Sequence, residues 1–263
     1  MHTGRIGHPS LLPKGAKLVA PSAIAAQGSV FTHQGMRDFV APKEMTRADI
    51  EQAISEFADA ARNAIAAGFD GVEIHGANGY LVHQFLAPNA NHRTDEWGGS
   101  PSKQSRFAYE VAAAVVGAIG AERTGIRLSP GVLNNGIDDG PEAAATYLPL
   151  ITALQELDLA YLHILEAGDR NLTHTIRERW SNTLMLNPTT PGRPTGPDEL
   201  ELIDEGLADL ISFGALFLAN PDLPERLAKG GGPLNEPDRS TFYGGGAEGY
   251  TDYPTLVRAE KQQ

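Results

Sequence analysis

The chain has 263 residues, of which 41% are hydrophobic and 21% charged, and it carries a net charge of -12 with no cysteine. The absence of cysteine excludes disulfides, thiolate nucleophiles and thiolate metal sites, and the eight histidines show no metal-ligand spacing. The acidic balance without a basic patch argues against nucleic acid and anionic membrane surfaces as partners. No apolar run is long enough to span a bilayer and no secretory signal pattern opens the chain, so we expect a cytoplasmic protein.

We expect one domain over residues 1–263, in three parts. Residues 1–45 are irregular and rich in Pro, Gly and Ser, with a hairpin predicted around 28–42, which is typical of a capping segment. Residues 46–230 alternate between helical and strand patterns. Residues 231–263 form a tail with several glycines, which we expect to line a pocket.

The first helix is predicted to begin at Thr46. Thr46 followed by Asp49 is typical of an N-cap with an acidic group in the first turn. Residues 50–69 then repeat apolar residues at helical spacing. This helix should lie outside the strand that follows it.

Five short apolar runs are predicted as strands, and helical patterns precede four of them. This alternation favours an α/β fold with a parallel sheet. The five runs are GVEIH at 71–75, TGIRLSP at 124–130, LAYLHILE at 159–166, TLMLN at 183–187 and DLISFGALFL at 209–218.

Three polar side chains follow the first of these strands, namely His75, Asn78 and Tyr80. The carboxyl edge of a parallel sheet is where active sites of α/β enzymes lie. An imidazole and an amide can converge on one oxygen and stabilise negative charge there, and a phenol can deliver a proton. A histidine and an asparagine after a strand also commonly satisfy backbone groups in a loop, so the spacing alone leaves both interpretations open.

The longer run GVEIHGANGYLVHQFLAPNANHRTDEWGGSPSKQSRF, at 71–107, resembles the signature of the Old Yellow Enzyme family of FMN-dependent ene-reductases. The likeness continues at GIRLSP and at RSTFYGGGAEGYTDYP, and it covers nearly the whole chain. The resemblance implies that His75 and Asn78 bind the carbonyl oxygen of an α,β-unsaturated substrate. It also implies that Tyr80 protonates the α-carbon after the flavin delivers hydride to the β-carbon.

The resemblance implies a (β/α)8 TIM barrel that binds FMN and uses NADPH or NADH as reductant. In this likeness Arg127 and Gly214 match FMN-binding residues, and Phe242 and Tyr243 match aromatics of the substrate pocket. The family's first strands would precede Met1, so with about five strands we expect an incomplete barrel. An open barrel edge predicts a homo-oligomer or a partner chain that completes it.

The segments that match the flavin phosphate site depart from the family pattern. Residues 188–199 are dense in proline, which has no N–H to give to a phosphate, and Ala215 stands where the family has arginine. Arg193 is a candidate replacement for that arginine. Three functions therefore stay open: an ene-reductase, a flavin-free isomerase or cyclase that uses the same trio, and a non-catalytic scaffold or binding partner.

Overall fold

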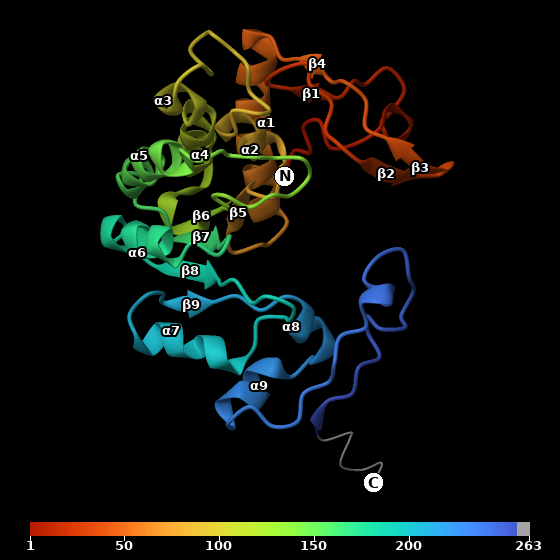
Figure 1. Cartoon of the computed structure of the whole chain (residues 1–263), viewed down its shortest axis with the longest axis vertical. Helices are drawn as coiled ribbons and strands as arrows, with labels where there is room; N and C mark the ends of the chain where they lie inside the picture. Colours follow the sequence, from red (N-terminus) through yellow and green to blue (C-terminus); the bar gives the residue numbers. More distant parts are fainter. Residues whose placement is uncertain (257–263) are drawn as a thin grey trace. The chain divides into compact units, whose positions relative to one another are not determined.

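The computed structural model describes residues 1–256 and divides into two compact units, Met1–Leu186 and Asn187–Gln263 (Figure 1). The expected single domain stays a prediction. Within residues 1–256, no helix combines the length and the apolar composition needed to cross a membrane.

The first unit opens with short elements outside the main sheet. Strand β2 (Ser29–Thr32) pairs antiparallel with β3 (Gly35–Asp38), which confirms the predicted hairpin. Strand β1 (Val19–Ala20) pairs in parallel with β4 (Lys43–Glu44) and so ties the segment to the start of the first helix. A 3-10 turn, η1 (Pro9–Leu11), precedes them.

Helix α1 (Arg47–Ala66) begins at the predicted cap. The Thr46 hydroxyl accepts the Asp49 N–H, and the Asp49 carboxylate accepts the Thr46 N–H at 2.8 Å, so two otherwise unpaired amides are satisfied. The buried face of the helix consists of Ile50, Ala53, Ala58 and Ala61. Small side chains on this face let the helix pack closely against its neighbours.

The first four predicted strands are confirmed as β5 to β8. In the first unit the neighbours run in the order β5, β6, β7, β8, and the two pairs β5–β6 and β6–β7 are parallel. The bounds are β5 (Val72–Gly76), β6 (Thr124–Leu128), β7 (Tyr161–Leu165) and β8 (Leu184–Asn187). The register places His75 opposite Arg127, and Arg127 opposite His163.

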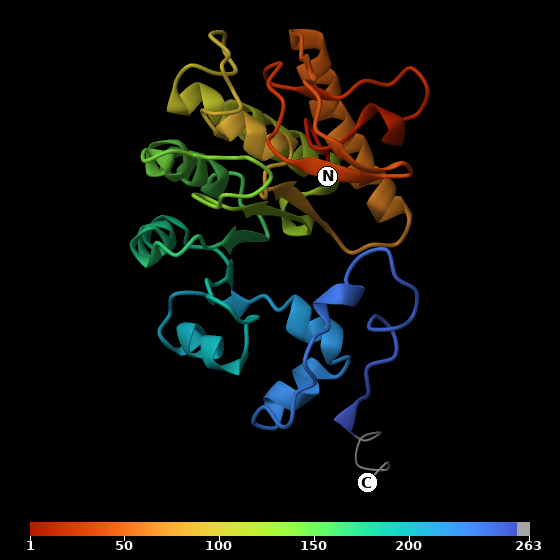
Figure 2. The same ribbon diagram turned by 45° about the vertical axis from the view of Figure 1, so that its right-hand side comes forward.

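The two faces of this sheet differ in chemistry because successive side chains of a strand point to opposite sides. One face carries buried aliphatic residues: Ile74, Ile126, Leu128, Leu162 and Ile164. Helices α1, α4 (Arg106–Ile119), α5 (Ala143–Gln155) and α6 (Arg170–Arg179) lie side by side in chain order (Figure 2). Shorter helical elements connect them: α2 (Leu81–Leu86), α3 (Pro101–Gln104) and η2 (Ala121–Arg123).

The second unit confirms the fifth predicted strand only in part. Strand β9 covers Leu210–Ile211, whereas a helix begins after Gly214, so the strand predicted through residue 218 is wrong at its end. Strand β9 lies among short helices. These are η3 (Pro197–Leu200), α7 (Glu201–Asp204), α8 (Ala215–Ala219), α9 (Leu223–Ala228) and η4 (Arg239–Thr241). A buried arginine organises this unit. Arg226 pairs with Asp222 at 2.7 Å and donates to the carbonyl oxygens of Pro233 and Pro254, so it ties the following segment to α9.

Candidate active site

The second face of the sheet in the first unit is polar, and we call it the polar face: Glu73, His75, Arg127, Tyr161 and His163. The β5–β6–β7 register brings these side chains onto one side of three adjacent strands. Gly125 lies among them, and a Cβ there would come within 2.3 Å of the Tyr161 ring. The glycine therefore makes room for the tyrosine.

A chain of hydrogen bonds crosses the polar face. Arg127 Nη1 donates to His163 Nε2, and His163 Nδ1 donates to a Glu73 carboxylate oxygen at 2.9 Å. Burial opposes ionisation of Glu73, but the hydrogen bond from His163 and the nearby positive charge outweigh it, so the pKa of Glu73 is lowered. Burial, with the charge and hydrogen bond of Glu73, raises the pKa of Tyr161 to about 12.

His75 is a neutral hydrogen-bonding group at physiological pH. Burial lowers its pKa below the ordinary value of 6.5, and the positive charge of Arg127 on the neighbouring strand lowers it further. Burial also lowers the pKa of Arg127, whose guanidinium stays protonated. The face thus combines a fixed cation with an uncharged imidazole.

The loop after β5 turns sharply and carries the other two members of the trio. Asn78 has a positive φ of 58°, which few residues other than glycine adopt, and Tyr80 is the N-cap of α2. The rings of His75 and Tyr80 lie edge to face with centroids 5.1 Å apart. The structure therefore brings His75, Asn78 and Tyr80 together at the carboxyl end of β5, as the sequence predicted.

The backbone of Asn78 is fully bonded, whereas its side chain is not. Its N–H donates to Ser129 Oγ at 2.9 Å, and its carbonyl oxygen accepts from Asn135 Nδ2 at 2.8 Å. Within the described residues, Asn78 Oδ1 and His75 Nδ1 are buried without a hydrogen-bond partner. Buried polar atoms of this kind call for an explanation, and a bound ligand is one.

The other predicted site residues lie in the second unit. Gly214 is the N-cap of α8, and Phe242 is the C-cap of η4. Tyr243 follows it and is 92% exposed. The cofactor role of Gly214 and the pocket roles of Phe242 and Tyr243 stay predictions.

Arg193 is occupied by a carboxylate in its own loop. Its Nη1 donates to Glu199 Oε2 at 2.9 Å, and its Nη2 also contacts Glu199. The Gly196 N–H donates to the same carboxylate at 2.7 Å. The guanidinium is therefore engaged with an anion of the protein.

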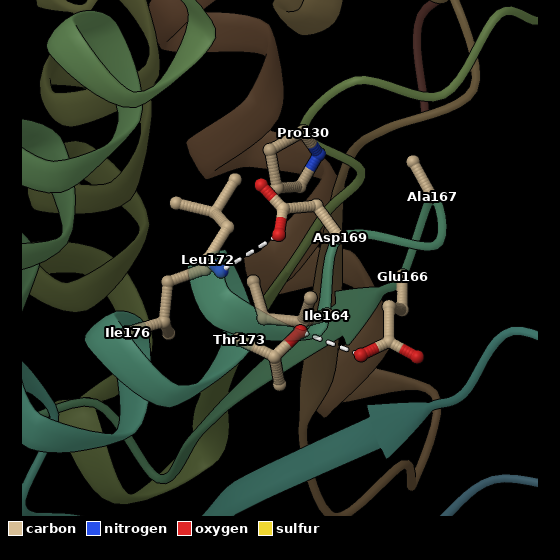
Figure 3. A pocket seen from close by; sticks show the side chains of 8 residues that line it. All are labelled: Pro130, Ile164, Glu166, Ala167, Asp169, Leu172, Thr173 and Ile176. Carbon is tan, nitrogen blue, oxygen red and sulfur yellow. Dashed lines mark hydrogen bonds between the residues drawn. The ribbon is translucent and has the colours of Figure 1, made fainter.

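A small cavity lies beyond the end of β7 (Figure 3). Thr173 Oγ1 donates to the buried Glu166 at 2.7 Å, and the Leu172 N–H donates to Asp169 at 3.4 Å. The cavity has a volume of about 10 Å³, which is room for a single water. Because its polar groups are paired, we assign it no substrate.

Glu73, Tyr161 and His163 are the members of the polar face that the sequence analysis did not single out. Glu73 and Tyr161 each stand two residues before a histidine within their strands, in GVEIH and AYLHILE, so the alternation of strand residues carried the signal. What was lacking was the register between the strands, which alone shows that the two side chains meet.

Comparisons with known proteins place this site in a family. Residues 2–232 match the model of the NADH:flavin oxidoreductase / NADH oxidase family. A probable flavin mononucleotide-dependent alkene reductase of Leishmania infantum is 41% identical over 260 residues, which are 96% of this chain and 70% of the relative.

Solved structures agree with the sequence match. An old yellow enzyme homologue from Zymomonas mobilis superposes with a TM-score of 0.89 at 36% identity, over 97% of this chain and 72% of the other. Morphinone reductase in complex with tetrahydroNAD superposes with a TM-score of 0.87 at 40% identity, over 97% and 71%. The chain therefore belongs to the NADH:flavin oxidoreductase family that includes Old Yellow Enzyme, and it is an oxidoreductase of the FMN-dependent ene-reductase type.

Proposed function

We propose that this protein reduces the C=C bond of α,β-unsaturated carbonyl compounds at the carboxyl end of β5. The observation that carries the proposal is the trio itself: His75, Asn78 and Tyr80 lie together, and His75 Nδ1 is a buried atom that no group among the described residues satisfies. An imidazole nitrogen left unpaired beside a protonated arginine fits a polar ligand better than it fits a structural loop.

Each residue of the trio has a distinct role in the proposed reaction. The neutral imidazole of His75 and the side-chain nitrogen Nδ2 of Asn78 donate hydrogen bonds to the substrate carbonyl oxygen, where negative charge develops. Fixed donors stabilise that charge more than water does because they need no reorganisation. Tyr80 then gives its phenolic proton to the α-carbon, as general acid.

Arg127 is the residue that we assign to the ring of FMN. A half-buried, protonated guanidinium on the polar face suits the electron-rich edge of an isoalloxazine, and it lies opposite His75 in the β5–β6 register. When bound, the flavin supplies the hydride and a nicotinamide, NADPH or NADH, restores it.

The phosphate end of FMN is held weakly in our proposal. Ala215 has no charge to offer, and Arg193 is paired with Glu199. A charge-assisted contact contributes roughly 1.5–3 kcal/mol, so its loss raises Kd about 10- to 150-fold. The variant Ala215→Arg should tighten FMN binding, measured by fluorescence titration, and Leu218→Arg on the same helix serves as the control.

The wider architecture is also part of the proposal. We infer that the strands and helices belong to a (β/α)8 TIM barrel, supported by the order β5 to β8, in which β5, β6 and β7 are parallel, and by the family. The substrate class, small unsaturated carbonyl compounds, is supported by the name of the alkene reductase relative. The expected homo-oligomer or partner chain stays a prediction, which light scattering of the purified protein tests.

One experiment separates this function from the alternatives. The purified chain is mixed with excess FMN, desalted and scanned for a flavin band, and NADPH-dependent loss of a cyclic enone is then followed. Tyr80→Phe should lower the reduction rate about 10²- to 10⁴-fold, the usual contribution of a general acid, whereas Tyr109→Phe on α4 should not. A colourless protein that still isomerises or cyclises an unsaturated carbonyl would favour the flavin-free alternative, and full activity of Tyr80→Phe would refute the proton transfer.

A further inference from the structure

Beneath the loop that carries Asn78 and Tyr80 lies a set of polar side chains that the reaction above does not use. We call it the buried support: Ser129, His83, Asp139 and Tyr147. The side chain of His83 is 0% exposed and that of Asp139 is 2% exposed. Burying polar groups this deeply destabilises the fold unless all of their hydrogen bonds are made, so we consider the partners of each group in turn.

Its hydrogen bonds fix the form of the His83 ring. The Gly79 N–H donates to His83 Nδ1 at 3.1 Å, so this nitrogen carries a lone pair. His83 Nε2 therefore bears the proton and donates it to Asp139 Oδ1, also at 3.1 Å. His83 thus has one acceptor aimed at the loop and one donor aimed at a carboxylate.

Asp139 is held in turn by two further donors. The Gly131 N–H donates to its Oδ2 at 2.7 Å, and the Tyr147 hydroxyl donates to the same oxygen at 3.2 Å. A buried carboxylate with three donors keeps its position and orients the imidazole that binds it. The support is therefore rigid on the side away from the loop.

On the loop side, the buried support receives two consecutive amides. The Asn78 N–H donates to Ser129 Oγ, and the next N–H, that of Gly79, donates to His83. The two residues have φ values of 58° and 80°, a backbone conformation that disfavours residues with a side chain. Without these acceptors, Asn78 would have little reason to keep the conformation that places its amide beside His75.

We propose that His83 and Asp139 are positioning residues for the reduction. Through the Gly79 amide they hold the turn at Asn78, and so fix the amide of Asn78 and the phenol of Tyr80 relative to the substrate carbonyl. This inference rests on the proposed function for its catalytic consequence. Its structural part, the fixed turn, can be measured separately.

Two substitutions of His83 separate positioning from packing. In His83→Asn, the side-chain oxygen replaces Nδ1 and still accepts the Gly79 N–H. In His83→Gln, the side-chain nitrogen replaces Nε2 and still donates to Asp139, but the Gly79 N–H loses its acceptor. A packing role predicts the larger loss for the smaller asparagine, whereas positioning predicts the larger loss for glutamine.

The first measurement is hydrogen–deuterium exchange of a peptide that contains residues 77–81. We expect His83→Gln to speed exchange there roughly tenfold or more, since a buried amide loses its partner, and His83→Asn to stay near wild type. Equal exchange in the two variants would overturn the inference. This result does not depend on activity, so it stands even if the proposed function fails.

The second measurement is the kcat of enone reduction with FMN and NADPH. His83→Gln should lower kcat about 10- to 100-fold and His83→Asn only a few fold. The effect of His83→Gln should be clearly smaller in a Tyr80→Phe background than in wild type, because the part that acts through the Tyr80 phenol is lost. Effects that multiply in full in the double variant would contradict action through the loop. Should His83→Gln fail to fold, Tyr147→Phe, which removes one donor to Asp139, takes its place, with a smaller loss of kcat that must likewise be reduced beside Tyr80→Phe.

Discussion

At the scale of single residues, the polar face sets the charge of each of its members through its neighbours. His75 is neutral because it is buried beside Arg127, and Glu73 is ionised because His163 donates to it. The same carboxylate holds the proton on Tyr161. A change in one of these groups should therefore be detected at another.

The lowered pKa of His75 makes the stability of the fold depend on pH. The unfolded chain titrates His75 near 6.5 and the folded chain at a lower pH, so below about pH 6.5 the unfolded state binds the additional proton. We expect the free energy of unfolding to fall as the pH drops from that value toward the folded pKa. Urea unfolding at about pH 7.5 and about pH 5.5 should show a smaller difference for His75→Asn than for wild type. An unchanged difference would mean that His75 is not the titrating group.

The substitution Glu73→Gln should change the titration of Tyr161. Burial, the charge of Glu73 and its hydrogen bond raise the pKa of Tyr161 to about 12, and the variant removes the charge while burial remains. Tyr161 should therefore titrate at a lower pH than in wild type, yet above its ordinary value. Ultraviolet absorption during alkaline titration measures this, with Tyr161→Phe in each background to identify the signal. A titration that does not move would show that Glu73 and Tyr161 do not interact in solution.

At the scale of elements, sequence patterns predicted most of what the structure contains. The hairpin, the capped helix α1 and the first four strands are confirmed because each depends on contacts within a few residues or on regular alternation. The fifth run, 209–218, is all apolar at its end, and such a run does not distinguish a strand from the helix that forms there. The position of His75, Asn78 and Tyr80 at the carboxyl end of β5 could be predicted for the same reason, because all three lie within a few residues of one strand. The hydrogen-bond partners of Glu73 and the members of the buried support could not be predicted, because they are far apart in the sequence. Asp139, for example, is 56 residues from His83, and only the folded structure brings the two side chains together.

The capping box of α1 offers a test of an element. Thr46→Ala removes the hydroxyl that accepts the Asp49 N–H, so the unfolding free energy should fall by about 0.5–2 kcal/mol. Thr152→Ala is the control, since its hydroxyl donates to Leu148 within an exposed turn of α5 and its loss should change stability by less than about 0.5 kcal/mol. Urea unfolding of both variants decides the matter, and equal losses would contradict a special role of the cap.

At the scale of the whole molecule, the expected single domain stays a prediction, and the structure divides into two compact units between Leu186 and Asn187. Patterns in the sequence predict helices and strands, but they do not predict which elements pack together into one compact unit. Within the second unit, cohesion depends on a feature without a sequence signature, the buried Arg226. Its importance follows only from the two carbonyl oxygens that it binds, 7 and 28 residues away.

Replacing this arginine should loosen the second unit. Arg226→Met removes the arginine's hydrogen bonds to Asp222 and to the carbonyl oxygens of Pro233 and Pro254, and breaking a buried pair of this kind costs about 3–5 kcal/mol. We expect faster trypsin cleavage after Arg239, which lies in the tethered segment. Lys229→Met removes an exposed ion pair on the same helix and should leave the cleavage rate unchanged. Equal rates for wild type and Arg226→Met would show that other contacts hold the segment.

The alternation of polar and apolar side chains along β5, β6 and β7 also limits how the sequence of such a protein can evolve. Odd-numbered positions from Glu73 to His163 carry the reactive groups, while even-numbered ones such as Ile126 and Leu162 fill the interior beneath the helices. A point substitution at an odd position can therefore alter chemistry and leave the interior intact. A one-residue deletion in the same strand would exchange the two sets and damage both at once. New specificities should accordingly arise in these strands by substitution, whereas changes of length are confined to the loops between them.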